Sequence, residues 1–460
     1  IAEATATSLK VDSRLKERIK KLELAGIGIL KERKRIYPKG RIASQVLGFV
    51  GIDNQGLAGI ESRYDDYLKG RSGRLITERD VRGRDIMTSG LREIQAPSDG
   101  MNLTLTIDEP IQYVAERELR KMVRQSQAKA GIVIVMDVKS GEILALATYP
   151  DFDPNEYNKF KADILNNRAV TEVYEPGSTF KLVAVASAIQ EKAITPNSHI
   201  YCPDVINIGK RTIRNSHPIK FKKGRYVKPV DVLKDSINTG AANVGIKLGK
   251  DKLYAGIKKF GFDRSSGVDL PGESRGILRH PDKWAEIDVA TISFGQGIAV
   301  TPMQLIANLS SIANSGVRVK PRVVKRIEGP GKSYIKIFTP EKRGESLSPK
   351  VADAVLKMSE VVVEDGTGWH AQIDHFRIGG KTGTSQKAKP GGGYYTDSVI
   401  SSFIGFAPIS DPQISVLVVI DDPKTDIWGG TIAAPVFKTV TEFTLRHLNI
   451  SPDNVKTSML

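Results

Sequence analysis

The apolar segments of this chain are short and fall into two groups that lie far apart in the sequence. The first group comprises residues 131–137 and 142–148, and the second comprises residues 376–380, 401–407 and 414–420. Each segment has the length of a strand and falls well short of the roughly 18 residues that a membrane-spanning helix needs. Helical patterns occupy residues 178–192 and 304–314, between the two groups. Strands from both ends of a domain with helices inserted between them predict an α+β fold.

Further elements follow from local patterns. Residues 102–107 alternate as a strand, residues 109–125 and 433–448 are amphipathic as in helices, and a glycine-containing loop at 138–141 predicts a hairpin. Residues 1–97 are charged and interrupted by many glycines, with one helical stretch at 12–24, which indicates an extended, irregular module. A turn cluster at 96–100 predicts a domain boundary after residue 97.

The chain is strongly basic. Its 460 residues include 68 Lys and Arg against 52 Asp and Glu, a net charge of +16, and local clusters occur at residues 31–35 and 220–225. This balance suits nucleic acid, an anionic membrane surface or an anionic polymer, but neither cluster has interleaved aromatic residues in a recognisable RNA- or DNA-reading pattern. One cysteine excludes a disulfide scaffold and a cysteine-based zinc site, and the six histidines form no zinc-protease motif, so no metal ligand is predicted.

The strongest local pattern is Glu-Pro-Gly-Ser-Thr-Phe-Lys at residues 175–181. Pro-Gly interrupts the chain, and Ser178 then begins an apolar helix with Lys181 one turn later on the same face. A serine hydroxyl is a weak nucleophile that needs a base, and a buried lysine of lowered pKa can supply one. The start of the helix adds backbone N–H groups that stabilise an oxyanion. Taken alone, the pattern more often marks a capping serine followed by a solvated lysine.

Two further patterns follow along the chain. Ser-Ile-Asn at residues 236–238 is by itself typical of a turn or a helix cap. Lys-Thr-Gly-Thr at residues 381–384 lies on a predicted strand, where Gly383 would let an extended peptide approach the backbone. A phosphate-binding loop is excluded there, because the residue five positions before Gly380 is His375 rather than glycine.

Together the three patterns point to a family. Ser-x-x-Lys, Ser-x-Asn and Lys-Thr-Gly, about 58 and then 145 residues apart, form the motif set of penicillin-binding proteins and serine β-lactamases. The chain resembles the class B penicillin-binding proteins, the monofunctional D,D-transpeptidases of bacterial cell-wall synthesis, and Glu-Pro-Gly before Ser178 resembles the division-type members. The resemblance covers nearly the whole chain and rests on residues 35–51, 59–61, 174–181, 294–304, 379–386, 401–408 and 429–437.

The resemblance implies a domain plan. Residues 1–97 would form an elongated N-terminal pedestal of the dimerisation type. Residues 98–450 would form a penicillin-binding, serine β-lactamase-like transpeptidase domain, in which an antiparallel sheet carries inserted helices. Residues 451–460 would form a C-terminal tail.

The resemblance also implies a role for each motif residue. Ser178 would attack the penultimate D-Ala carbonyl of a peptidoglycan stem peptide, release D-Ala and form an acyl-enzyme that the amine of a second stem peptide resolves into a cross-link. Lys181 would take the Ser178 proton, and Ser236 would relay a proton to the leaving group. The oxyanion hole would be formed by the backbone N–H groups of Ser178 and Thr384. The substrate-binding residues would be Asn238, Lys381, Thr382, Gly383 and Thr384, with Lys381 holding the substrate carboxylate and lowering the pKa of Lys181.

The implied partners are peptidoglycan stem peptides, β-lactam antibiotics that acylate Ser178, and a membrane glycosyltransferase that polymerises glycan together with division or elongation proteins. No metal, organic cofactor or nucleic acid is implied. The family is located at the bacterial cytoplasmic membrane with its catalytic domain on the outer side. The single N-terminal anchor expected of the family is absent from this sequence.

Other functions remain open at the level of sequence. A serine β-lactamase or β-lactam sensor would use the same acyl-enzyme, but a β-lactamase needs a water-activating base, and none can be identified. A non-catalytic scaffold that binds the cell wall through its basic surface would not need three intact motifs. A nucleic-acid binder has the least support.

Three further residues, one cysteine and two tryptophans, lie outside the motifs. Cys202 is predicted to be a buried or half-buried thiol without a nearby base. Trp369 and Trp428 lie in loops near the third motif, and we expect both to pack in the core rather than at the rim of a cleft.

Overall fold

The computed structural model describes residues 13–24, 26–28, 34–76, 78, 80–82, 93–219, 225–389 and 391–454. The chain divides into two compact units, Ile1–Ile36 and Tyr37–Leu460. The first unit contains the predicted N-terminal helix as α1 (Ser13–Lys21). No described helix is long and apolar enough to cross a membrane. Most of the two basic clusters and residues 455–460 of the predicted tail lie outside the described residues.

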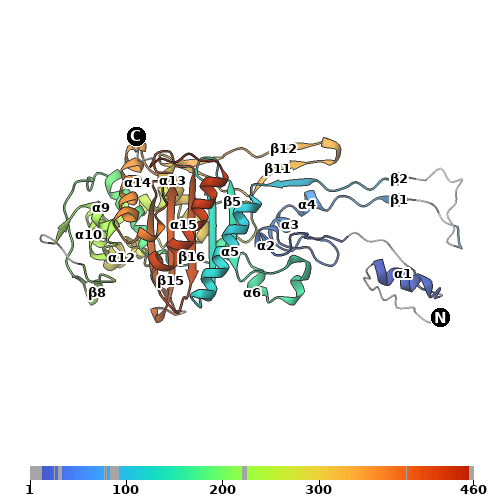
Figure 1. Cartoon of the computed structure of the whole chain (residues 1–460), viewed down its shortest axis with the longest axis horizontal. Coiled ribbons are helices and arrows are strands. Elements are labelled where there is room, and N and C mark those ends of the chain that lie inside the picture. The colour runs from blue at the N-terminus through green and yellow to red at the C-terminus, as the bar shows by residue number, and fades with distance from the viewer. Residues whose placement is uncertain are drawn as a thin grey trace, which may run out of the picture. The chain divides into compact units, whose positions relative to one another are not determined.

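A five-stranded antiparallel sheet forms the centre of the second unit, in the order β14-β15-β16-β4-β5 (Figure 1). Its strands are β4 (Ala130–Asp137), β5 (Ile143–Tyr149), β14 (Gly379–Ala388), β15 (Tyr394–Ala407) and β16 (Ile414–Asp421). The two apolar groups of the sequence meet where β4 pairs with β16, with Val133 opposite Val418. This arrangement confirms the α+β prediction, and it leaves β14 at an edge of the sheet.

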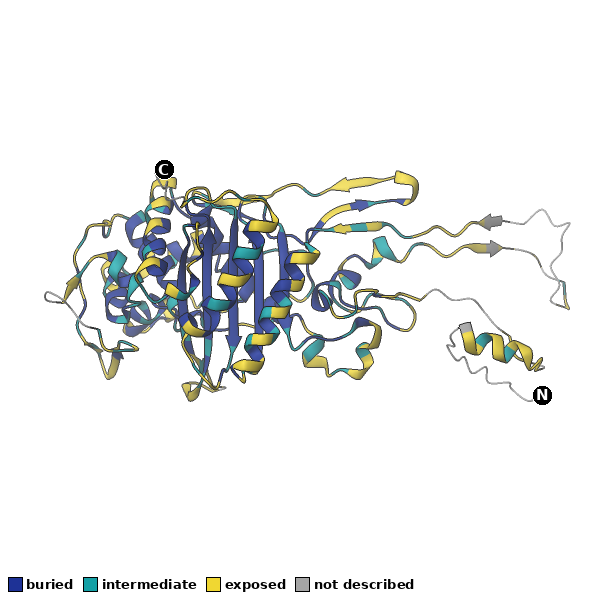
Figure 2. Ribbon diagram, in the orientation of Figure 1, coloured by how far each residue is buried: buried dark blue, intermediate teal, exposed yellow. Residues whose placement is uncertain are grey.

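Both faces of this sheet are buried (Figure 2). In β4, Ile134 contributes to one hydrophobic cluster and its neighbour Val135 to the other, as the twofold alternation of strand side chains requires. Helices α5 (Glu109–Gln125) and α15 (Gly429–His447) pack on one face, and α13 (Pro302–Ala313) packs on the other. Burial of both faces explains why these strands are continuous apolar runs rather than alternating ones.

Capping residues determine where the long helices begin. Helix α5 has the predicted bounds, because Asp108 accepts a hydrogen bond from the Ile111 amide at 3.2 Å and Pro110 fits the first turn. Helix α13 begins with a capping box in which Thr301 and Gln304 exchange hydrogen bonds of 2.9 and 3.0 Å.

Several predicted boundaries are wrong, among them the start of β15, which lies at Tyr394, seven residues before the predicted residue 401. Helix α15 begins at Gly429, four residues before the predicted start, with the two glycines forming its first turn and Pro435 lying inside it. Strand β14 begins at Gly379 instead of residue 376, because Phe376 pairs with Ile373 in a local turn. The predicted strand at 102–107 is β3 (Asn102–Leu105), and it belongs to a separate sheet.

Further helices and 3₁₀ turns complete this unit, and α14 (Pro349–Glu364), with 16 residues, is the longest of them. The other helices of this unit are α2 (Ser44–Leu47), α3 (Gly59–Arg63), α4 (Asp65–Leu68), α6 (Ala162–Leu165), α7 (Arg168–Thr171), α8 (Lys181–Gln190), α9 (Pro229–Lys234), α10 (Asn238–Leu248), α11 (Lys250–Phe260), α12 (Glu286–Ile292) and α14 (Pro349–Glu364). The 3₁₀ turns are η1 (Pro154–Lys159), η2 (Gly177–Phe180), η3 (Pro281–Lys283), η4 (Pro330–Lys332) and η5 (Trp369–Ala371).

The minor sheets have the orders β1-β2, β12-β11-β3, β10-β13, β6-β9 and β7-β8. Their remaining strands are β1 (Arg74–Ile76), β2 (Glu93–Gln95), β6 (Ile200–Tyr201), β7 (Val205–Ile208), β8 (Arg211–Arg214), β9 (Tyr226–Val227), β10 (Val317–Val319), β11 (Val324–Glu328), β12 (Ile335–Ile337) and β13 (Lys342–Glu345).

Candidate active site

Ser178 lies in the 3₁₀ turn η2, which leads directly into the buried helix α8. The preceding Gly177 has a φ of +55°, in the left-handed region, and a Cβ built there would lie 3.0 Å from Cβ of Ser385 on β14. The Gly177 amide donates to the Gly295 carbonyl at 3.1 Å. This entrance to the helix therefore requires glycine, and it holds the nucleophile candidate against the edge strand while its side chain stays half exposed.

Lys181 is fully buried one turn after Ser178. Its Nζ donates to the Ser236 carbonyl oxygen at 2.5 Å and to Asn238 Oδ1 at 2.8 Å, and it lies 3.1 Å from Ser236 Oγ. Burial, and secondly the charge of Lys381, lowers the pKa of Lys181 well below its usual range. A lysine in this state can act as a base, as the first motif predicted.

The second motif occupies the connection between α9 and α10. Ser236 has a φ of +54°, an uncommon conformation for a serine, and Asn238 is the first residue of α10. The Asn238 Nδ2 group donates to the Arg214 carbonyl at 3.1 Å, which leaves Oδ1 directed at Lys181. The segment predicted as a turn or cap thus also supplies the polar groups that contact Lys181.

The third motif lies on the edge strand β14. Lys381 is fully buried, and its Nζ lies 3.0 Å from Ser236 Oγ and 3.2 Å from Thr382 Oγ1. Burial lowers the pKa of Lys381 to about 7, and the negative charge of Asp235 opposes this shift. The Ser236 hydroxyl is therefore within hydrogen-bond distance of both buried lysines.

The rest of this strand packs closely against the neighbouring segments. A Cβ at Gly383 would lie 2.4 Å from Ser402 Oγ and 3.0 Å from Thr179 Cγ2. Thr384 is partly exposed, and its Oγ1 accepts from the Gly429 amide at 3.2 Å. The structure thus brings all predicted site residues to one place where η2, the α9–α10 connection and β14 meet.

One predicted contact is not made. The Ser178 hydroxyl has no hydrogen bond to any described residue, including Lys181. Catalytic hydrogen bonds are often long in a free enzyme and shorten only in the complex with substrate, so this geometry leaves the nucleophile assignment as a prediction.

One ring near the lysines, that of His217, was not identified from the sequence. The rings of His217 and Trp428 meet edge to face at 6.3 Å, and burial, followed by the charge of Lys181, lowers the pKa of His217. Trp428 is 40% exposed and Trp369 is 58% exposed, so the expectation that both pack in the core is wrong. The sequence around His217 contains no functional pattern. The position of this side chain near the lysines depends on how its loop folds.

A buried carboxylate adjoins the first motif. Glu175 accepts hydrogen bonds from the Gly297 amide at 2.9 Å and from the Tyr394 hydroxyl at 3.2 Å, and burial raises its pKa. These contacts connect the segment before Ser178 to the neighbouring loop and to strand β15. Sequence patterns gave no sign of this connection.

No group of three or more His, Cys, Asp or Glu side chains suited to a metal ion occurs among the described residues. Cys202 is fully buried, which confirms the prediction of a buried thiol, and burial raises its pKa to about 12.

Comparisons with known proteins agree with this geometry. The penicillin binding protein transpeptidase domain matches residues 131–442, and the penicillin-binding protein dimerisation domain matches residues 4–105. The chain is 36% identical over 457 residues to the stage V sporulation protein D of Bacillus subtilis (strain 168), an alignment that covers 98% of this chain and 70% of that protein.

Two further relatives support the same assignment. The chain is 34% identical over 453 residues to the peptidoglycan D,D-transpeptidase FtsI of Escherichia coli (strain K12), covering 97% of this chain and 73% of that protein. The crystal structure of penicillin binding protein 3 from Mycobacterium tuberculosis, complexed with aztreonam, aligns with a TM-score of 0.79 at 29% identity over 91% of both chains. The chain therefore belongs to the class B penicillin-binding proteins, a family of peptidoglycan D,D-transpeptidases.

Proposed function

We propose that this protein cross-links peptidoglycan stem peptides as a serine D,D-transpeptidase, through an acyl-enzyme on Ser178. One observation carries the proposal: two fully buried lysines, Lys181 and Lys381, approach the same hydroxyl, that of Ser236, within 3.1 Å, beside the serine that begins α8. Two lysines of lowered pKa at one polar centre are costly to bury, and such sites are characteristic of proton-transfer chemistry.

In the acylation step, Ser178 Oγ attacks the carbonyl carbon of the penultimate D-Ala. Neutral Lys181 accepts the hydroxyl proton, and Ser236 passes a proton to the nitrogen of the terminal D-Ala as the peptide C–N bond breaks. The products are an ester on Ser178 and free D-Ala. General acid–base assistance of this kind contributes about 10²- to 10⁴-fold to a rate.

The same site suits the charges of the substrate. Lys381, with Thr382 and Thr384, would hold the terminal carboxylate, and the amide groups of Ser178 and Thr384 would bind the oxyanion. Because β14 is an edge strand, its backbone can pair with the extended stem peptide, with Asn238 contacting the peptide amide. The missing side chain of Gly383 instead allows Thr179 and Ser402 to pack closely against the strand. The amine of a second stem peptide then attacks the ester, forms the cross-link and returns the proton to Ser178.

β-Lactams would acylate Ser178 in place of the peptide, as indicated by the relative from Mycobacterium tuberculosis that was crystallised with aztreonam and with ampicillin. We further infer a division-type role from the Glu-Pro-Gly sequence before Ser178, which resembles the division-type members of the family. Residues 1–97 would act as the pedestal that contacts a membrane glycosyltransferase and division proteins, residues 98–450 as the transpeptidase domain, and residues 451–460 as a tail. The protein would work on the outer side of the bacterial cytoplasmic membrane.

A cross-linking assay tests the nucleophile. Purified protein is given donor stem peptides ending in D-Ala-D-Ala and acceptor peptides with a free side-chain amine, and released D-Ala and cross-linked dimers are counted. Ser178→Ala should abolish both products, whereas the matched control Ser333→Ala, at an exposed serine, should retain both. Cross-linking by the Ser178→Ala protein would show that another residue is the nucleophile.

The same preparation distinguishes the alternatives. Rapid hydrolysis of a penicillin in place of a long-lived adduct would indicate a β-lactamase, and a stable adduct without any cross-linking would indicate a sensor. Absence of both acylation and cross-linking in the wild-type protein would indicate a non-catalytic scaffold.

A further inference from the structure

The loop of residues 214–217 lies beside the second motif, although none of the three motifs includes it. It begins at the end of strand β8, which packs against helix α10 (Figure 1). Its side chains are exposed or half-buried. The loop nevertheless makes four hydrogen bonds to the first two residues of α10, one of which is Asn238 of the second motif.

Asn215 supplies the cap that α10 lacks in its own sequence. The residue at the capping position is Ile237, whose side chain has no acceptor atom. Asn215 Oδ1 instead accepts from the Thr239 amide at 3.1 Å, and the Thr239 hydroxyl lies 3.4 Å from the same oxygen. The first turn of α10 is therefore capped by a residue 24 positions earlier in the chain.

The turn that precedes α10 needs support from its surroundings. Ser236 has a φ of +54°, and a serine keeps this uncommon conformation only where neighbouring contacts hold it. On the α9 side, the Ser236 amide donates to the Leu233 carbonyl at 3.2 Å. On the α10 side, the cap from Asn215 fixes the residues that follow the turn.

The same loop determines the direction of the Asn238 carboxamide. The Nδ2 group of Asn238 donates to the Arg214 carbonyl at 3.1 Å and to Ser216 Oγ at 3.3 Å. The reversed amide would place two acceptor oxygens, Asn238 Oδ1 and the Arg214 carbonyl, against each other. It would also remove the acceptor that Lys181 Nζ contacts at 2.8 Å. The loop therefore keeps Asn238 Oδ1 directed at Lys181.

The direction of this oxygen matters when Lys181 accepts a proton. The lysine gains a positive charge in that step, and hydrogen bonds to a charged group are about twice as strong as those between neutral groups. The contact with Asn238 Oδ1 therefore strengthens as the proton arrives, which is the condition for lowering a reaction barrier. Displacement of the loop would free the carboxamide and weaken this contact.

We propose that Asn215 is a positioning residue for acylation, which fixes the 214–217 loop to the start of α10 so that the Asn238 carboxamide directs its oxygen at Lys181. This role rests on the transpeptidase function proposed above, in which Lys181 is the base. It adds a residue outside the three motifs, and it requires an acceptor oxygen at position 215.

Acylation of the full chain by a fluorescent penicillin tests this role. Asn215→Ala should lower the second-order rate constant about tenfold at the pH of its own maximum, the value of one hydrogen bond to a charged group. Asn215→Asp keeps the acceptor oxygen and places its charge at the start of a helix, where a negative charge is favourable, so it should react within about twofold of the wild type. The matched control Asn207→Ala, at an exposed asparagine of the same hairpin that bonds Thr212 at 3.1 Å, should also react as the wild type does.

The pH dependence separates positioning from a general loosening of the site. Loss of an acceptor for the charged form lowers the pKa of Lys181, so the lysine stays neutral to lower pH. The acidic limb of the rate profile should therefore move about half a pH unit or more to lower pH in Asn215→Ala. Lys381 and His217, the titratable neighbours of Lys181, are unchanged in this variant. An unmoved limb, or one displaced to higher pH because Lys181 has become more solvated, would contradict the proposed role.

A second control addresses the loss of a helix cap as such. Asp108→Ala removes the side-chain cap of α5, and it should destabilise the protein to urea about as much as Asn215→Ala does while acylation stays near the wild-type rate. Asn215→Gln moves the acceptor by one methylene and gives the same test if Asn215→Ala does not fold.

Three results would overturn the role of Asn215. These are a tenfold loss of acylation in Asp108→Ala, a wild-type rate in Asn215→Ala, or equal losses in Asn215→Ala and Asn215→Asp. Failure of the folded wild-type protein to be acylated would instead refute the proposed function, so the two failures are distinguishable.

Discussion

Lys381 and Lys387 lie on the same face of strand β14 and differ in their surroundings. Lys381 is fully buried, makes no ion pair with a described carboxylate, and contacts the hydroxyls of Ser236 and Thr382. Lys387 is partly exposed and pairs with Asp421 at 2.7 Å. A lysine buried without an ion-pair partner has its pKa lowered, here to about 7, so that it can exchange protons near neutral pH. The paired lysine instead joins two strands at the end of the sheet.

Replacing Lys181, the proposed base, should cause the largest loss of acylation. Lys181→Met keeps the length and apolar stem of the side chain but cannot accept the Ser178 proton, so acylation by a penicillin should fall about 10³-fold. Stopped-flow acylation with a fluorescent penicillin measures the rate constant. The control Lys247→Met, at an exposed lysine of α10, should react as the wild type does. Acylation of Lys181→Met at near wild-type rate would mean that another group removes the proton.

The pH dependence of acylation should follow the two buried lysines. Lys181 must be neutral, so the rate should fall at acidic pH as it becomes protonated. Lys381 must be charged to hold a carboxylate, so the rate should also fall as the pH rises past the pKa of about 7 in the free enzyme. The second-order rate constant measured from pH 5 to 10 should therefore give a bell-shaped curve. The alkaline limb should disappear in Lys381→Met, and a profile that keeps this limb would contradict the assignment.

Substitution of Gly177, the glycine before the nucleophile, should cause an intermediate loss of acylation. Gly177→Ala introduces a Cβ at positive φ that also lies 3.0 Å from Ser385, so the variant should lose about tenfold in acylation and about 1–2 kcal/mol in the free energy of unfolding. Gly209→Ala separates the two causes, because Gly209 has a similar φ of +58° but open space around it. Equal acylation losses in both variants would mean that crowding at Ser385 is irrelevant.

Substitution of Lys387, the lysine that pairs with Asp421, should cause the smallest loss of acylation. Lys387→Met leaves Asp421 without its partner at a partly exposed position, and we expect a loss of about 1 kcal/mol in the free energy of unfolding by urea denaturation. Acylation should fall by no more than about fivefold, far less than in Lys381→Met. If both variants lost acylation equally, the distinction between the two lysines would be wrong.

Local sequence patterns predicted the helical turn and the strands whose structure depends mainly on residues close together in the sequence. The i,i+3 spacing placed Ser178 and Lys181 on one turn. Apolar runs of strand length predicted β4, β5 and β16 to within one residue at each end, whereas β14 and β15 extend well beyond the predicted runs. Glycines misled the prediction at the start of α15, where Gly429 belongs to the helix because tertiary packing outweighs its low propensity.

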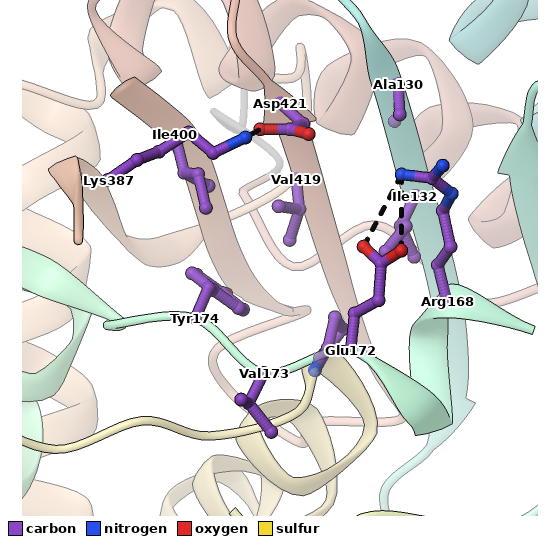
Figure 3. Close-up of a pocket in the computed structure, with 12 residues that line it drawn as sticks. Ala130, Ile132, Arg168, Glu172, Val173, Tyr174, Lys387, Ile400, Val419 and Asp421 are labelled. Atoms are coloured by element: carbon purple, nitrogen blue, oxygen red, sulfur yellow. Dashed lines mark hydrogen bonds and ion pairs between the residues drawn. The ribbon is translucent and has the colours of Figure 1, made fainter. Parts of the chain in front are cut away.

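Contacts between distant segments could not be predicted in the same way. The approach of Lys381 to Ser236 spans 145 residues and depends on how β14 sits at the sheet edge. A hollow lined by Ile132, Ile400 and Val419 from three neighbouring strands likewise depends on segments that are far apart in the sequence (Figure 3). The exposure of Trp428 was likewise missed, since an aromatic residue at the rim of a site has the same sequence signature as one in the core.

Mass spectrometry of the protein after exposure to benzylpenicillin tests the assignment of Ser178 as the nucleophile. We expect a single, long-lived adduct of the mass of the intact antibiotic, located by peptide mapping on Ser178. The adduct should be absent from the Ser178→Ala protein. An adduct on Ser236 or on any other residue, or no adduct at all in a folded sample, would contradict the assignment of Ser178 as the nucleophile between two buried lysines.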